Sequence, residues 1–220
     1  MGLLRSFRPR RAVSDLRFRY RTHEFEGLDI HVRTLRDTQE YCSDDDAEAL
    51  GISSAQWPLF GVVWDAGLSL ATMMVEEDIE GRRILEVGCG IGLASLVLNE
   101  READITATDQ HPRAEGFLEH NTSINGGRSI PFTRTGWVDD EDGMGRFDLI
   151  IGSDLLYGRD HAEALSAFIL RHALPSCEVL LIDGGRGHVP RFQAALESGG
   201  FTCTSREATT GKGRALRFLR

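Results

Sequence analysis

The segment Ile-Leu-Glu-Val-Gly-Cys-Gly-Ile-Gly at residues 84–92 has the strongest chemical signature in the chain. Its glycines let the backbone approach a ligand closely, and the N–H groups at the start of a following helix favour an anion. The spacing is G-x-G-x-G and position 93 is leucine, so the dinucleotide pattern G-x-G-x-x-G is not met. Glu86 precedes the turn, where a pyrophosphate would gain little from a carboxylate.

A ligand with an amino acid end carries both a carboxylate and an ammonium, so it can use the N–H groups and the acid together. We therefore expect such a ligand at this turn, in contact with Glu86, Gly88, Cys89, Gly90 and Gly92. The alternative is a tight strand–helix turn that binds nothing.

Two further acids follow apolar segments that have the character of strands. Asp109 ends Thr-Ala-Thr-Asp, 23 positions after Glu86, where an acid accepts hydrogen bonds from a ribose diol in such folds. Ser153 and Asp154 follow the apolar run 147–152, which delivers them to the carboxyl edge of a sheet, where ligands bind. Asp154 either faces the reactive centre of a cofactor or caps the next helix.

The elements that position these residues alternate along the chain. Residues 18–25 and 28–35 alternate with period two around Gly27, which predicts a hairpin. Helices are expected at Leu59 to Ile79, Ile91 to Glu100, Pro112 to Asn125, His161 to His172 and Pro190 to Ser198. Strands are expected at Arg83 to Val87, Ile105 to Thr108, Ile130 to Thr135, Phe147 to Gly152, Val179 to Asp183, Phe201 to Arg206 and Arg214 to Leu219.

This alternation predicts an α/β fold with a doubly wound, mostly parallel sheet of seven strands. The last two strands lie close together in the sequence, so they form a hairpin, and one of them runs antiparallel to the rest. We expect a basic N-terminal extension with its hairpin at residues 1–54 and the main α/β domain at residues 55–220.

In their order and spacing, these motifs resemble the class I, seven-strand S-adenosylmethionine-dependent methyltransferases, which are Rossmann-like. Within that class, Gly-Val-Val-Trp-Asp-Ala-Gly at residues 61–67, Trp137 and Asp-Leu-Leu-Tyr at residues 154–157 resemble the protein-lysine methyltransferases. That family carries an acidic–x–x–aromatic motif after the fourth strand, and the likeness covers residues 55–185.

The resemblance implies that S-adenosylmethionine is the cofactor and that a set of matching positions lines its site. These positions are Trp64, Gly88 to Gly90, Asp109, Trp137 and Ser153. An aromatic face beside adenine is physically sensible because stacking adds to the burial of apolar area. The other interpretation of either tryptophan is an ordinary core residue.

Asp154 and Tyr157 are the expected catalytic residues. An amine acceptor must lose a proton to expose its lone pair, and Asp154 can attract and orient an ammonium through a charge-assisted hydrogen bond. Tyr157 can present a hydroxyl or a π-face to the same cation. Three functions compete: methylation of a protein lysine, methylation of a small amine or heterocyclic nitrogen, and non-catalytic cofactor binding. The intact Asp154-x-x-Tyr157 motif favours an enzyme.

Charge distribution bears on the acceptor. Residues 1–23 hold seven arginines and one acid, Asp15, so they carry +6. Because the whole chain carries −9, the remainder carries −15, which disfavours nucleic acid and suits a cationic partner. The alternative interpretation is that this acidity only confers solubility.

Composition limits the remaining possibilities. The four cysteines are scattered and the acids 44–46 have no further ligand at useful spacing, so we expect neither a disulfide framework nor a metal site. No apolar run is long enough to span a membrane, and no secretory signal precedes the domain. We expect a cytoplasmic monomer.

Overall fold

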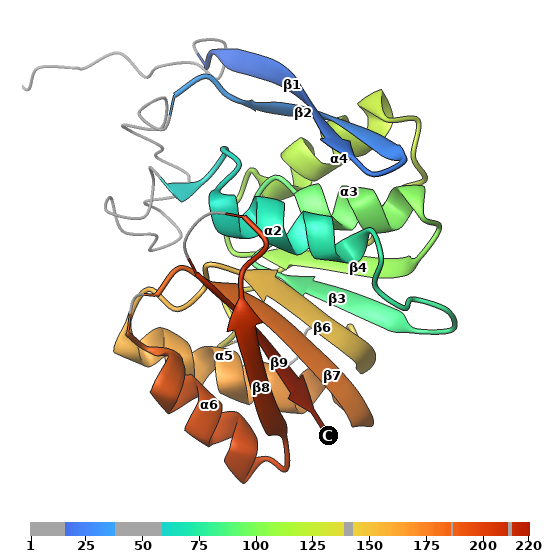
Figure 1. Cartoon of the computed structure of the whole chain (residues 1–220). Helices are drawn as coiled ribbons and strands as arrows, with labels where there is room; N and C mark the ends of the chain where they lie inside the picture. The colour runs from blue at the N-terminus through green and yellow to red at the C-terminus, as the bar shows by residue number, and fades with distance from the viewer. Residues whose placement is uncertain (1–15, 38–58, 139–142, 186, 211–212) are drawn as a thin grey trace, which may run out of the picture.

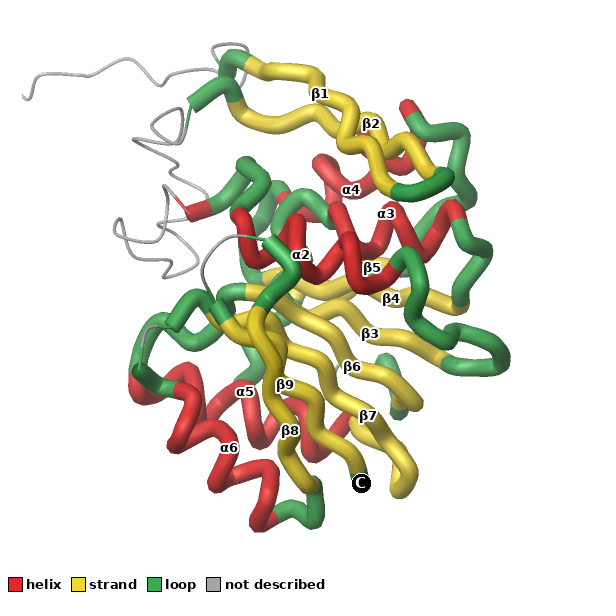
Figure 2. The backbone as a smooth tube through the Cα atoms, in the orientation of Figure 1, coloured by secondary structure: helices red, strands yellow, loops and turns green. Residues whose placement is uncertain are grey.

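The computed structural model describes residues 16–37, 59–138, 143–185, 187–210 and 213–220. A seven-stranded sheet forms its centre, with strand order β5-β4-β3-β6-β7-β9-β8 (Figures 1 and 2). The strands are β3 (Arg83–Val87), β4 (Asp104–Asp109), β5 (Phe132–Arg134), β6 (Phe147–Ser153), β7 (Ala173–Asp183), β8 (Thr202–Glu207) and β9 (Arg214–Leu219). β9 pairs antiparallel with both of its neighbours, and the other pairings are parallel, which confirms the predicted sheet and its terminal hairpin.

Helices cover both faces of the sheet, as Figure 1 shows. They are α2 (Asp65–Met74), α3 (Leu93–Glu100), α4 (Ala114–Ile124), α5 (Arg159–His172) and α6 (Val189–Ser198). Alternate strand residues point to opposite faces: Ile84 packs with α2 and α3, whereas Leu85 packs with α5 and α6. In the central strands β3 and β6, most side chains on both faces are buried, which explains the nearly continuous apolar runs in the sequence.

The N-terminal hairpin forms a further layer outside the helices. Strands β1 (Phe18–Phe25) and β2 (Leu28–Leu35) pair antiparallel around the turn at Gly27, which confirms the predicted hairpin. In Figure 1 the hairpin lies over α3 and α4, away from the sheet. Its buried side chains Ile30 and Val32 join the core cluster of α2, α3 and α4, so the hairpin packs as part of the same body.

The expected helix from Leu59 to Ile79 is wrong at both ends, because α2 spans only Asp65–Met74. Gly61 has a φ of +86° and Trp64, the residue before the helix, is extended, so the chain reaches α2 as an irregular segment. The left-handed backbone at Gly61 favours glycine, and a Cβ at this position would also lie 2.4 Å from Leu35 Cδ1 of the hairpin.

Other boundaries shift by smaller amounts. α3 begins two residues later than expected because Gly92, its N-cap, is left-handed with a φ of +80°. α4 begins at Ala114 rather than at Pro112, and β5 is confined to Phe132–Arg134. β7 begins at Ala173, six residues earlier than predicted. Pro175 explains the difference, because proline cannot donate a hydrogen bond to a neighbouring strand and so argues against a strand in the sequence.

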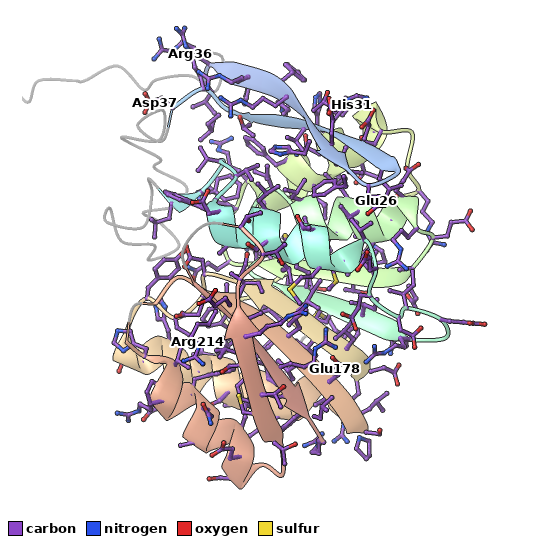
Figure 3. All side chains as sticks on the ribbon, viewed as in Figure 1. Glu26, His31, Arg36, Asp37, Glu178 and Arg214 are labelled. Atoms are coloured by element: carbon purple, nitrogen blue, oxygen red, sulfur yellow. The ribbon has the colours of Figure 1, made fainter. Side chains whose placement is uncertain are left out.

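Two arginines and two glutamates link β7 and β9 to the segment between α2 and β3. Glu178, labelled in Figure 3, accepts hydrogen bonds from Arg82 at 2.9 Å and from Arg217. Arg217 also donates to Glu77 at 2.6 Å. The side chains of Glu77 and Glu178 are only 9% and 11% exposed. These ion pairs therefore differ from solvent-exposed pairs, which contribute little to stability.

Among the described residues, no helix is long and apolar enough to span a membrane. The acids 44–46, Cys42 and Lys212 lie outside the residues that the structure describes.

The ion-pair network predicts an asymmetric response to charge removal. Glu178→Gln leaves two arginines with a single carboxylate, and we expect the free energy of unfolding to fall by about 2 kcal/mol. The matched control is Glu163→Gln, which removes an exposed pair with Arg191 and should cost about 0.5 kcal/mol. Urea unfolding of both variants tests this, and equal losses would contradict the structural importance of the network.

Candidate active site

A cavity opens at the carboxyl ends of β3, β4 and β6, and the segment 59–64 with the start of α2 closes its other side. Ten of the eleven predicted site residues line it. They are Trp64, Glu86, Gly88, Cys89, Gly90, Asp109, Trp137, Ser153, Asp154 and Tyr157. Residues as distant in sequence as Trp64 and Tyr157 thus share one pocket.

The glycine loop takes the shape that its sequence predicts. Gly88 and Gly90 have φ values of +64° and +56°, which side chains rarely adopt. A Cβ at Gly90 would have no protein atom within 4 Å, so this position leaves the backbone open to the cavity. Gly92 does not line the cavity. Its Cβ would lie 2.4 Å from Leu118 Cδ1, so that glycine serves the packing of α3 on α4.

Glu86 is 4% exposed and faces the start of α3. Its Oε2 accepts hydrogen bonds from the Ser95 backbone N–H at 2.9 Å and from the Ser95 hydroxyl. Burial raises the pKa of Glu86 to about 7, against the opposing effect of the two Ser95 bonds. The carboxyl therefore anchors α3 beneath the loop while it lines the cavity.

Asp109 joins β4 to the glycine loop. Oδ2 accepts the Gly90 N–H at 2.8 Å and Oδ1 accepts the His111 N–H at 2.7 Å. Burial raises the pKa of Asp109, and these backbone hydrogen bonds act in the opposite direction because they favour the carboxylate. Each carboxylate oxygen has a further lone pair, so the group can accept additional hydrogen bonds from a ligand in the cavity.

Asp154 is held at the end of β6 in a left-handed conformation, with a φ of +56°. Its N–H donates to the Ile182 carbonyl at 2.7 Å, which fixes the turn against β7. A Cβ at Gly184 would lie 3.0 Å from Asp154 Oδ1, so the glycine leaves space for this carboxylate. The alternative role as a helix cap is wrong, because the N-cap of α5 is Gly158 and no side chain caps it.

Aromatic side chains form the rim. Trp64 is 39% exposed and donates its indole N–H to the Leu59 carbonyl at 2.9 Å. Trp137 has a φ of +73°, and its ring meets His161 edge-on at 5.8 Å, as Tyr157 does at 6.0 Å. Trp137 also packs against the core, so it is partly buried and partly cavity wall.

Sequence reasoning missed a second group of cavity residues. Phe60 stacks on His111 with ring centroids 3.8 Å apart, and this stack joins the segment before α2 to the loop after β4. The others include Gln110, Thr135 and His161. Gln110 and His111 follow Asp109 directly, so their place after a strand was the available signal. Pairing of Phe60 with His111 depends on tertiary contact and has no local signature.

Among the described residues, no three His, Cys, Asp or Glu side chains gather in a way that could hold a metal ion. Burial raises the pKa of the Cys89 thiol well above its ordinary value, so this cavity residue is a neutral thiol at physiological pH.

Comparison with known proteins shows which enzymes the chain is similar to. A family model described as "Lysine methyltransferase" matches residues 52–186. The protein N-lysine methyltransferase METTL21A of Danio rerio is 34% identical over 123 residues, which cover 51% of this chain and 56% of that protein. The chain spans about half the length of the curated relatives that it matches.

Solved structures share the fold. A ribosomal protein L11 methylase from Lactobacillus delbrueckii subsp. bulgaricus has a TM-score of 0.62 at 22% identity and covers 74% of this chain and 82% of its own. Magnesium protoporphyrin IX methyltransferase from Synechocystis PCC 6803, with bound SAM, has a TM-score of 0.60 at 15% identity, with coverage of 83% and 88%. At these identities the likeness establishes a common fold alone.

The raised pKa of Glu86 predicts a pH-dependent stability. Between pH 4.5 and about 7 the unfolded chain has lost the proton of this carboxyl and the folded protein retains it, so the free energy of unfolding falls as pH rises. Glu86→Gln removes the ionisation and keeps an acceptor for Ser95. Relative to the unmodified protein, the variant should gain about 2 kcal/mol on going from about pH 5 to about pH 8. Urea unfolding measures this gain, and a difference independent of pH contradicts the raised pKa.

Proposed function

Because this chain belongs to the lysine methyltransferase family, we propose that it transfers the methyl group of S-adenosylmethionine to lysine side chains of a protein substrate. One observation carries the proposal: the family match spans the cavity in which the glycine loop, Asp109 and Asp154 come together. Several of the matching relatives are named as lysine methyltransferases, which supports the same acceptor, although one is named as a histidine protein methyltransferase.

The cavity fits the cofactor chemically. The open backbone at Gly90 leaves room for the amino acid end of S-adenosylmethionine, and Asp109 can accept from both ribose hydroxyls. The rings of Trp64 and Trp137 line the cavity and offer apolar surface for an adenine. When bound, the cofactor supplies a methyl group that its sulfonium has already activated.

The residues of the chain must then align the acceptor nitrogen with the methyl group and remove water from around it. Asp154, only 9% exposed, draws the lysine ammonium into the cavity through a charge-assisted hydrogen bond. Tyr157 stands three residues further on and lines the same cavity, where its ring face or hydroxyl can contact the cation. The ammonium releases one proton to solvent before attack, which exposes the nitrogen lone pair. Asp154 then orients the neutral amine by accepting a hydrogen bond from one of its remaining N–H groups.

A protein substrate agrees with the shape and charge of the site. Trp64 is 39% exposed, so the rim of the cavity reaches the surface, where the end of a long lysine side chain can enter. Residues 24–220 carry −15, and this charge attracts a basic substrate over long range.

Two substitutions should separate cofactor binding from chemistry. Asp109→Ala removes acceptors for two ribose hydroxyls and should weaken the affinity for S-adenosylmethionine about thirtyfold, at about 1 kcal/mol for each hydrogen bond. Asp154→Asn should leave this affinity within about threefold and reduce turnover about ten- to a hundredfold. Calorimetric titration with the cofactor and with NAD measures binding.

The matched control is Asp160→Asn, which changes an exposed acid in the first turn of α5. It should alter neither affinity nor turnover. Equal loss of affinity in the Asp109 and Asp154 variants would refute the role given to Asp154. Comparable affinity of the unmodified protein for NAD would refute the cofactor.

Labelled methyl groups should appear on lysines of other proteins. The chain contains a single lysine, so Lys212→Arg removes all lysine automethylation from the assay. We expect label from S-adenosylmethionine on lysate proteins, located on lysine by mass spectrometry, and we expect the yield to fall as salt rises. Label confined to small molecules would instead favour a small amine acceptor.

A further inference from the structure

The N-terminal hairpin is joined to the helix layer through two asparagine side chains of α4. Asn125 Oδ1 accepts the His31 N–H at 2.8 Å, and its Nδ2 donates to the His31 carbonyl at 2.7 Å. One turn earlier, Asn121 Oδ1 accepts the Arg33 N–H at 2.8 Å, and Nδ2 donates to the Arg33 carbonyl at 3.4 Å. The two amides thus pair with alternate residues of β2 as a neighbouring strand would. Figure 3 labels His31 on this hairpin.

Asn121 makes one contact that Asn125 does not make. Its Nδ2 also donates to the Ile91 carbonyl at 3.2 Å. Ile91 stands between Gly90 and Gly92 and lines the cavity. A single amide, 0% exposed, therefore holds the backbone of the glycine loop and the backbone of the hairpin together.

Two further contacts bring the same hairpin to the cavity. The Leu35 N–H donates to the Gly61 carbonyl at 2.7 Å, and Gly61 belongs to the segment that closes the cavity. Arg33 lies over the Phe117 ring at 5.0 Å, and Phe117 meets Phe60 edge-on at 5.3 Å. The hairpin thus contacts the segment that closes the cavity through Leu35, and it is linked to the glycine loop through Asn121 of α4.

We propose that Asn121 is a positioning residue for the cofactor: it fixes the Ile91 carbonyl and with it the open backbone at Gly90, using the hairpin as a rigid support. This proposal rests on the proposed function, since it assigns the glycine loop to S-adenosylmethionine. A loop that is held in its binding conformation before the ligand arrives loses less conformational entropy on binding, so the affinity is higher. The N-terminal hairpin accordingly supports the cofactor site through Asn121.

The chain offers a matched pair of substitutions. Asn121→Asp keeps an acceptor for the Arg33 N–H but loses the donor to Ile91, while Asn125→Asp makes the same chemical change one turn away. We expect Asn121→Asp to weaken the affinity for S-adenosylmethionine about fivefold, the effect of one net hydrogen bond, and Asn125→Asp to leave it unchanged. Calorimetric titration of the purified full chain measures both.

Kinetics distinguish positioning from a general loss of structure. With a fixed lysate acceptor, the apparent KM for S-adenosylmethionine should rise about fivefold in Asn121→Asp, and the rate at saturating cofactor should stay within about twofold of the unmodified protein. Asn121→Ala against Asn125→Ala repeats the comparison without burying a charge, in case the aspartate variant fails to fold.

Normal affinity in a folded Asn121 variant, or an equal loss in its Asn125 partner, would overturn the positioning role alone. If the unmodified chain itself did not bind S-adenosylmethionine, the proposed function would fall, and the positioning role with it. The two failures are therefore distinguishable.

Discussion

The two helices that flank β3 in the fold lie on opposite faces of the sheet: α3 connects β3 to β4 on one side, and α5 connects β6 to β7 on the other. This reversal opens a crevice at the carboxyl ends of the strands, because no helix can cover the point where the winding changes direction. The glycine loop, Asp109 and Asp154 all lie at this edge. Every other feature of the site depends on this reversal, which places three strand ends around one space.

Within the crevice, the structure concentrates carboxyl groups. Glu86, Asp109 and Asp154 line one cavity, and the Asp109 charge contributes to the raised pKa of Glu86. Backbone N–H donors from Gly90 and His111 favour the Asp109 carboxylate, and Ser95 bonds to Glu86. A ligand with positive charge relieves the remaining repulsion. A sulfonium cofactor with an ammonium group and an acceptor that arrives as an ammonium suit this electrostatic environment.

Local sequence patterns were sufficient for the sheet, the glycine loop and the acids at the strand ends, because buried strands and glycine turns have local signatures. The aromatic residues Trp64, Trp137 and Tyr157 were instead indicated by the resemblance to a family. The predicted helix start at Leu59 is wrong because the chain is left-handed at Gly61, where it packs closely against Leu35 of the distant hairpin. The Phe60–His111 stack and the Asn121–Ile91 hydrogen bond were missed for the same reason. Each joins residues that are far apart in the sequence, and no spacing rule along the chain encodes such a contact.

A crystal structure of the chain with S-adenosylhomocysteine tests the central claim most directly. The account predicts the ligand in the cavity, with its ribose hydroxyls within hydrogen-bond distance of Asp109, its amino acid end against the glycine loop and its sulfur facing the side of Asp154. A ligand bound away from Asp109, or a ribose that contacts neither carboxylate oxygen, would contradict the assignment of this cavity as the methyl-transfer site.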